Sequence, residues 1–219
     1  MSYDLSTLPV PVARLVQEAL IQRGLYEGTT AGRPAGKTQR AFADYLLDEY
    51  PERAAVPKWL LAAREWIGLR EIPGVTHHPT IVRWWQAIGS WFRDDETPWC
   101  AAFVGGVLEA CGIRSTGSAA ARSYLDWGKP LPGPVTGAVV IYWRGARSGW
   151  QGHVGFVEGV DTRGNILTLG GNQSDAVNVK AFAPDRVLGY RWPLEEHAPV
   201  ADAVAVLSGE FEETGGNEV

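Results

Sequence analysis

The chain has 219 residues, of which 45% are apolar and 21% are charged, and its formal net charge is −5 at pH 7. This charge is uneven, because residues 194–219 hold seven acids and no Lys or Arg, whereas the rest of the chain has 20 basic and 18 acidic residues. The near balance excludes the strong positive field on which nucleic-acid binding depends. A run of about 18 apolar residues, as membrane insertion requires, is also absent from the sequence.

Residues 1–12 contain no basic segment followed by an apolar stretch, so we expect no cleaved signal peptide. The sequence therefore predicts a protein that is made in the cytoplasm and reaches any external substrate after lysis, by injection or on a particle. We also expect it to be a monomer. Its two cysteines, Cys100 and Cys111, fall in one helical pattern. Their Cα atoms would lie roughly 16 Å apart, which is too far for a disulfide.

Residues 1–50 are predicted to form a small helical module. Apolar positions favour helices over residues 12–23 and 38–47, joined by the Gly-rich stretch 24–36. The pattern resembles that of three-helix peptidoglycan-binding modules. Those modules carry an Asp-Gly pair, which is missing here and is replaced around Ala31 and Gly32. A helical support for the following domain is the alternative. The matching positions are Val16, Gln17, Leu20, Gly24, Gly28, Gly36, Thr38, Ala41 and Phe42.

Residues 51–57 are predicted to be a linker before the main domain. An amphipathic helix over residues 58–68 and a Trp-rich helix over residues 80–89 are expected to follow it. The loop between these helices contains His77 and His78. Adjacent histidine side chains rarely converge on one ion, so the pair indicates a solvated loop rather than a metal site.

Three acids, Asp94, Asp95 and Glu96, precede the next predicted helix. Carboxylates at this place complement the positive end of the helix dipole. Calcium binding is the alternative, but the acids lack the alternating spacing of a calcium loop. We predict neither a metal nor a cofactor for this protein.

The next helix is expected to begin near Cys100. Thr97 is predicted to cap it, Pro98 to occupy its first position and Gly112 to end it. A cysteine in the first turn of a helix meets unpaired N–H groups and the positive end of the dipole, which favour the thiolate. Cys100 is therefore a candidate nucleophile, and the alternative is a small buried apolar residue.

The second half of the chain changes from helical to strand-like periodicity. A short helix over residues 119–127 is followed by predicted strands over residues 138–143, 152–160 and 165–170. Helices first and antiparallel strands afterwards favour an α+β fold.

A tight hairpin between the last two predicted strands places a histidine and an asparagine together. With Val160 opposite Asn165, a constant register puts His153 opposite Asn172. An asparagine there can accept the Nδ1 proton of the ring and leave Nε2 facing the cysteine sulfur. A bulge would shift the register, and Gln173 is then the alternative partner.

A cysteine on a helix, followed by His and Asn on strands, is the papain-like order. The sequence resembles the NlpC/CHAP group of papain-like cell-wall hydrolases from about residue 59 to residue 193. This resemblance implies a papain-like domain over residues 58–193, with Cys100, His153 and Asn172 as catalytic residues and a peptidoglycan amide as substrate. His78-Pro79 stands where these families commonly carry Asn-Pro. The motifs that carry the resemblance are Pro98-Trp99-Cys100-Ala101-Ala102-Phe103-Val104, Gly152-His153-Val154-Gly155 and Leu169-Gly170-Gly171-Asn172-Gln173.

The catalytic hypothesis assigns supporting roles to other residues. Trp99, Trp143 and Trp150 are expected to bind substrate as walls of the groove, with core packing as the alternative. The Cys100 backbone N–H is a candidate oxyanion donor. A papain-like acyltransferase, a protease on another peptide and a non-catalytic wall-binding or virion protein are the alternative functions. A phage lysin, a tail-associated enzyme and an injected toxin all fit the sequence.

The acidic segment 194–219 contains few aromatic residues and several glycines. This composition predicts partial disorder. Residues 201–207 are compatible with a short helix.

Overall fold

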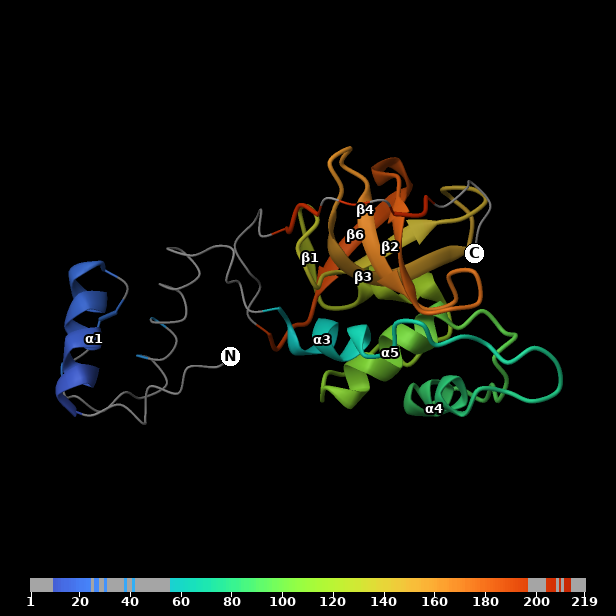
Figure 1. The fold of residues 1–219 in the computed structure, drawn as a ribbon, viewed down its shortest axis with the longest axis horizontal. Helices are drawn as coiled ribbons and strands as arrows, with labels where there is room; N and C mark the ends of the chain where they lie inside the picture. The colour runs from blue at the N-terminus through green and yellow to red at the C-terminus, as the bar shows by residue number, and fades with distance from the viewer. Residues whose placement is uncertain are drawn as a thin grey trace. The chain divides into compact units, whose positions relative to one another are not determined.

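A computed structural model of the chain divides into two compact units, residues 1–55 and residues 56–219 (Figure 1). The two units are described separately. The structure describes residues 10–24, 26–27, 30, 38, 41, 56–196, 204–207, 209 and 211–213.

The first unit contains helix α1 (Val10–Gln22), which confirms the helix predicted over residues 12–23. One face of α1 is buried, and there Gln17 Nε2 donates a hydrogen bond of 3.2 Å to Thr38 Oγ1. The predicted helix over residues 38–47 lies outside the described residues, apart from Thr38 and Ala41, which have helical backbone. Residues 1–9, most of residues 25–50 and most of the predicted linker also lie outside the described residues.

The second unit contains three α-helices and two short 3₁₀ helices among its described residues. The first helix is shorter than predicted, because turns replace it over residues 65–68. The segment predicted as a helix over residues 119–127 is a 3₁₀ helix. The bounds are α3 (Lys58–Arg64), α4 (Pro79–Ala87), α5 (Cys100–Ala110), η3 (Ala121–Asp126) and η4 (Pro184–Arg186).

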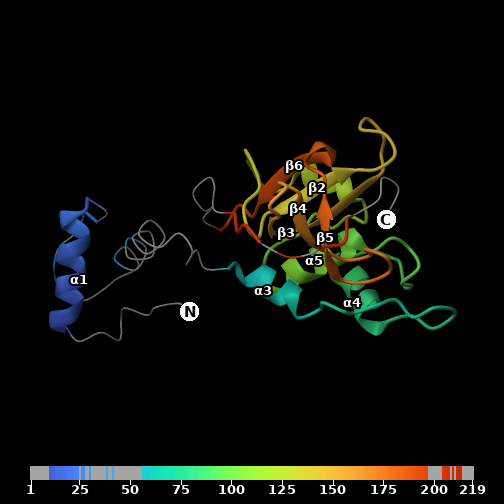
Figure 2. The ribbon, with the colours of Figure 1, turned by 45° about the horizontal axis from the view of Figure 1, so that its top comes forward.

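A six-stranded antiparallel sheet in the order β1-β6-β2-β3-β4-β5 forms the other layer. Helices α3, α4 and α5 lie on one side of the strands in both ribbon views (Figures 1 and 2). The α+β fold is therefore confirmed, although β1, β5 and β6 were not anticipated from the sequence. The strand bounds are β1 (Lys129–Leu131), β2 (Val139–Trp143), β3 (Gly152–Val160), β4 (Ile166–Gly170), β5 (Asn178–Phe182) and β6 (Val187–Trp192).

The β3–β4 hairpin differs from its predicted register near the turn. Val160 pairs with Ile166 instead of Asn165, since the Asp161 side chain accepts backbone N–H bonds within a longer turn. An irregularity between Val157 and Gly159 then restores the predicted pairing further along the hairpin. The extra residue at this bulge, Glu158, forms an ion pair with Arg64 of α3.

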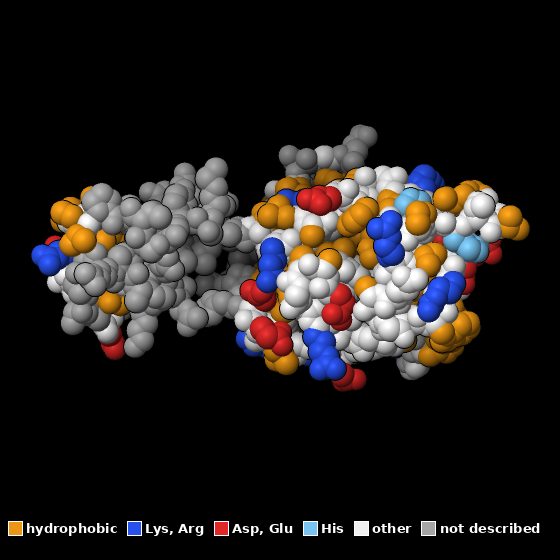
Figure 3. Space-filling model, turned by 90° about the horizontal axis from the view of Figure 1, so that it is seen from below, with side chains coloured by type: hydrophobic (Ala, Val, Ile, Leu, Met, Phe, Trp, Pro, Cys, Tyr) orange, Lys and Arg blue, Asp and Glu red, His pale blue; other side chains and the backbone are white. Residues whose placement is uncertain are grey.

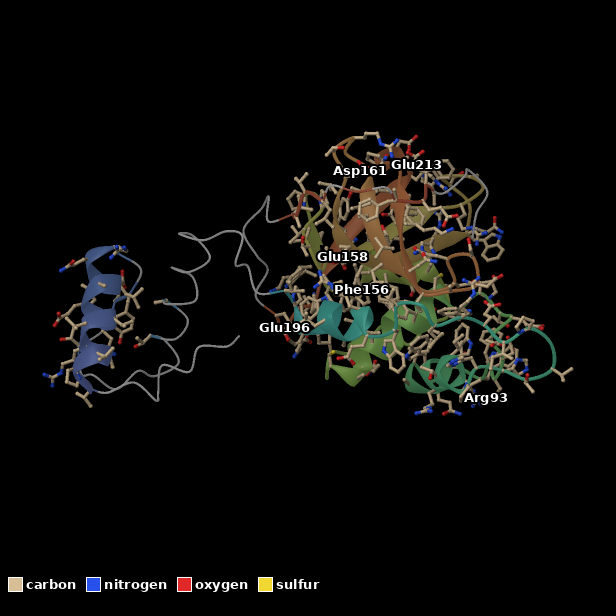
Figure 4. The ribbon with its side chains drawn as sticks, in the orientation of Figure 1. Arg93, Phe156, Glu158, Asp161, Glu196 and Glu213 are labelled. Atoms are coloured by element: carbon tan, nitrogen blue, oxygen red, sulfur yellow. The ribbon has the colours of Figure 1, made fainter. Side chains whose placement is uncertain are left out.

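Helix α5 packs between the sheet and α4. Figure 4 places Phe156 of β3 between the sheet and α5. The centroid of its ring lies 6.1 Å from the centroid of the Phe103 ring on α5. On the other side, a Cβ at Gly106 would lie 2.2 Å from the Trp84 ring. Glycine is required there because α4 and α5 approach so closely.

The C-terminal end of α5 agrees with the sequence prediction, and its N-terminal end does not. Trp99, rather than Thr97, is the N-cap residue, so Pro98 precedes the helix instead of beginning it. At the other end Gly112 has a φ of 72°, and Ile113 N–H donates to the Leu108 carbonyl, which completes a Schellman motif.

Part of the acidic segment pairs with the sheet. Val206 forms a parallel bridge with Val160, which contradicts the short helix predicted over residues 201–207. Glu213 forms a parallel β-bridge with Ala181 of β5. Its Oε1 also lies 2.5 Å from Arg163 Nη2, with which it forms an ion pair. Figure 4 shows Glu213 near Asp161 at this end of the sheet. Residues 205–207 and 212–213 of this segment therefore lie along strands β3 and β5.

The face in Figure 3 carries interspersed acidic and basic side chains on the second unit. Among the described residues, no helix has the length and apolar character needed to cross a membrane.

Candidate active site

Cys100 is the first residue of α5, and its sulfur lies against the start of β3. Burial raises the pKa of the Cys100 thiol, whereas the backbone N–H groups of Val154 and Ala101 hydrogen-bond the sulfur and lower it. Burial is the larger effect, so the pKa lies above its ordinary value. The N–H groups at the helix start thus favour the thiolate, as predicted, but burial outweighs them at this site.

His153 is the second residue of β3, and its side chain is buried. Its ring stacks on Phe182 of β5, with an interplanar angle of 9° and centroids 5.3 Å apart. The ring Nε2 lies 2.9 Å from Gln173 Oε1. These two contacts hold the imidazole in one orientation from both its face and its edge.

The hydrogen bonds of Gln173 determine which ring nitrogen carries the proton. Gln173 Nε2 donates to the Asn178 carbonyl at 2.8 Å and lies 3.3 Å from the Thr168 carbonyl. Because carbonyls only accept, the amide nitrogen faces them and Oε1 faces the imidazole. His153 Nε2 must then donate, and a neutral ring keeps its lone pair on Nδ1. The predicted orientation, with Nδ1 on the amide and Nε2 toward the sulfur, is reversed.

The predicted contact between Asn172 and His153 is not made. Strand β4 ends at Gly170, and Asn172 has a φ of 57°, so the hairpin register does not extend to residue 172. A Cβ at Gly170 would lie 2.5 Å from Gln173 Oε1 and 3.1 Å from His153 Nε2. Because Gly170 has no side chain, the Gln173 amide can occupy this space and bond the His153 ring. Gln173 was the alternative partner predicted from the sequence.

The site holds a neutral imidazole at neutral pH. Burial lowers the pKa of His153 to about 4, although the hydrogen bond that its ring donates to Gln173 acts in the opposite direction. The buried Nδ1 has no hydrogen-bond partner among the described residues. A thiol with a raised pKa beside a neutral base indicates a resting site without a thiolate–imidazolium pair.

The three tryptophans proposed as groove walls differ in exposure. Trp99 is fully buried, and its Nε1 donates to Glu71 Oε1 at 2.6 Å, so it belongs to the core rather than to a groove. Trp143 is half-buried and donates to the Asp185 carbonyl. Trp150 is 85% exposed.

The acids before α5 organise the preceding loop. Asp95 is completely buried and accepts hydrogen bonds from the Ile72 and His78 backbone N–H groups and from the His77 ring. Burial alone would raise the pKa of Asp95, but these donors lower it. The loop is largely exposed over residues 72–76, as predicted, but both histidines are half-buried, and His78 also caps α4 by accepting from Thr80 N–H.

No cluster of three or more His, Cys, Asp or Glu side chains suited to a metal ion occurs within the described part of the chain. Asp94 instead accepts from Thr97 N–H at 2.7 Å. Asp94 and Asp95 therefore act as local hydrogen-bond acceptors that connect the loop to the segment before α5.

Comparison with known families identifies a CHAP domain over residues 92–172. The matched segment includes Cys100 and His153 and ends immediately before Gln173. CHAP domains are typically cysteine- and histidine-dependent amidohydrolases or peptidases, and peptidoglycan is the substrate that the domain implies. No curated protein matches the chain. The resemblance of residues 1–50 to a peptidoglycan-binding module stays a prediction.

The pH dependence of Cys100 alkylation tests the protonation of the resting site. Iodoacetamide reacts with the thiolate, so a raised thiol pKa predicts a rate that still rises above about pH 9. The measurement uses the Cys111→Ala variant and follows the Cys100 peptide by mass spectrometry. A rate that reaches a plateau near about pH 5 would reveal a thiolate–imidazolium pair and contradict the neutral site.

Proposed function

We propose that this protein hydrolyses an amide bond of peptidoglycan, in the stem peptide or at the glycan–peptide junction. One observation carries the proposal: a buried cysteine lies against the strand of a histidine whose tautomer is set by a glutamine. The CHAP match supports the same reaction class.

The proposed mechanism begins with a neutral thiol and a neutral base. His153 Nδ1 takes the proton from Cys100 Sγ as the sulfur attacks the scissile carbonyl. Nδ1 then gives this proton to the leaving amine, and the C–N bond breaks to form a thioester. A water molecule, deprotonated by Nδ1, attacks the thioester and releases the carboxylic acid and the thiol. Nε2–H remains bonded to Gln173 throughout.

Backbone N–H groups at the start of α5 are suited to stabilise the developing charge. The groups of Cys100, Ala101 and Val154 already surround the sulfur. We assign the oxyanion of the tetrahedral intermediate to the Cys100 N–H, because this group is among the donors of the first helical turn that have no partner within the helix.

We further propose that the enzyme acts on the cell wall after lysis, injection or delivery on a particle. The predicted module in residues 1–50 would then bring the CHAP domain to its substrate. Muropeptide analysis of the digest distinguishes stem-peptide cleavage from cleavage at the glycan junction.

Digestion of purified sacculi tests the proposed reaction. Cys100→Ala and His153→Ala are expected to lower the rate of fragment release by at least about 100-fold, because each removes a reacting group. Cys111→Ala is the matched control and should retain activity, since Cys111 follows the far end of α5. Release at the parental rate by either site variant would contradict the mechanism.

A second comparison tests which neighbour positions the histidine. Gln173→Ala should lower kcat by about 10-fold or more, because the ring loses the acceptor that holds its tautomer. Asn172→Ala should have a much smaller effect, and Gln173→Glu should restore part of the activity by keeping an acceptor at Nε2. Similar losses in Gln173→Ala and Asn172→Ala, with no recovery in Gln173→Glu, would contradict the assigned role.

A further inference from the structure

Two arginines lie at the end of the sheet where His153 begins its strand. Across the three neighbouring strands β6, β2 and β3, Val187 pairs with Tyr142 and Tyr142 pairs with His153. Arg186 directly precedes this row on β6, and Arg144 directly follows β2. The topology therefore brings both guanidinium-bearing residues to the catalytic end of the sheet.

Arg186 is buried with part of its hydrogen-bonding capacity unused. Its exposed fraction is 8%, and its guanidinium lies 5.4 Å from the centre of the Trp143 ring. Nη2 donates to the Trp143 carbonyl at 3.0 Å, but no described residue accepts from the buried Nε or Nη1. A buried donor without an acceptor is costly, and native proteins retain few of them.

The arginines make the surroundings of the catalytic pair positive. The charge of Arg144 lowers the pKa of the Cys100 thiol, although burial raises it more. The charges of Arg144 and Arg186 also lower the pKa of His153. Their effects are smaller than those of burial, which lowers this pKa, and of the hydrogen bond to Gln173, which raises it. Among the described residues, no carboxylate forms an ion pair with either arginine.

A neighbouring arginine shows what a structural role looks like in this fold. Arg122 donates from all three of its side-chain nitrogens to the carbonyls of Gln151, Arg147 and Ala146. Its bonds tie the loop after β2 to η3. Arg186 has one such bond and two buried nitrogens without acceptors, so structural bonding accounts for only part of its guanidinium.

We propose that Arg186 and Arg144 form a carboxylate-binding subsite beside Cys100, which selects amide substrates that carry a free carboxylate near the scissile bond. Arginine suits this ligand, because its N–H groups match carboxylate oxygens and it keeps its charge when buried. As a statement about substrate choice, the proposal rests on the proposed amide hydrolysis. Peptidoglycan stem peptides contain such carboxylates.

Charge-selective alkylation tests the subsite without requiring activity. Iodoacetate carries a carboxylate and iodoacetamide does not, so the ratio of their rates at Cys100 reports binding of the anion. The ratio should fall by about 10-fold in Arg186→Gln and should also fall in Arg144→Gln, because a charged hydrogen-bond donor is lost. Arg83→Gln, on the exposed face of α4, is the matched control, and Cys111 provides a reference thiol in each sample.

Thermal unfolding identifies which variants are folded, and Arg144→Gln keeps the test decisive if Arg186→Gln unfolds. An unchanged ratio at Cys100 in a folded variant of either arginine would overturn the subsite. A fall in the ratio at Cys100, with none at Cys111 or in Arg83→Gln, supports it.

A substrate comparison then tests selection. Sacculi whose carboxylates have been amidated with carbodiimide and ammonia should be digested more slowly than mock-treated sacculi by the parent protein. Arg186→Gln should reduce or remove this difference. Equal parental rates on the two preparations would overturn the selection, whereas no digestion of either refutes the proposed function and leaves the alkylation ratio to decide on the subsite.

Discussion

The hydrogen bond between Gln173 and His153 is the interaction on which the site depends. The Gln173 amide cannot be reversed without losing its donation to the Asn178 carbonyl, so its oxygen faces Nε2 of the ring. This arrangement requires β4 to end at Gly170, where a side chain would occupy the space of the amide. The loop that follows turns sharply, with positive φ at Asn172, Ser174 and Asp175. The end of β4 and the loop after it thus together place the free lone pair of the His153 ring on Nδ1, where the proposed mechanism uses it.

Burial then determines the charge of the two reacting groups. It raises the pKa of Cys100 and lowers that of His153, and both shifts favour the uncharged forms. The N–H groups at the start of α5 oppose the first shift without reversing it. The helix therefore contributes more to the charge that develops on sulfur and oxygen during reaction than to a thiolate at rest. This balance supports the proposed general-base activation of the thiol.

Periodicity and local motifs were sufficient to predict the α+β fold, and the proposed catalytic residues Cys100 and His153 lie on contacting elements of the structure. They were insufficient for the third residue, because a constant register assumes that β4 continues past Gly170. The choice of Gln173 over Asn172 depends on a positive φ and on side-chain bonds across the loop. The partners of Asp95 also escaped prediction, since they join loops 17 to 23 residues apart. Pairing of Val206 with Val160 likewise depends on tertiary contact.

Nitrogen NMR of the His153 ring tests the central claim most directly. In the ¹⁵N-labelled full chain at about pH 6.5, loss of one signal in His153→Gln identifies this ring among the four histidines. The account predicts a neutral ring with its proton on Nε2 and a bare Nδ1, and protonation only as the pH falls toward about 4. A proton on Nδ1 at pH 6.5, in either the neutral or the imidazolium form, would contradict it.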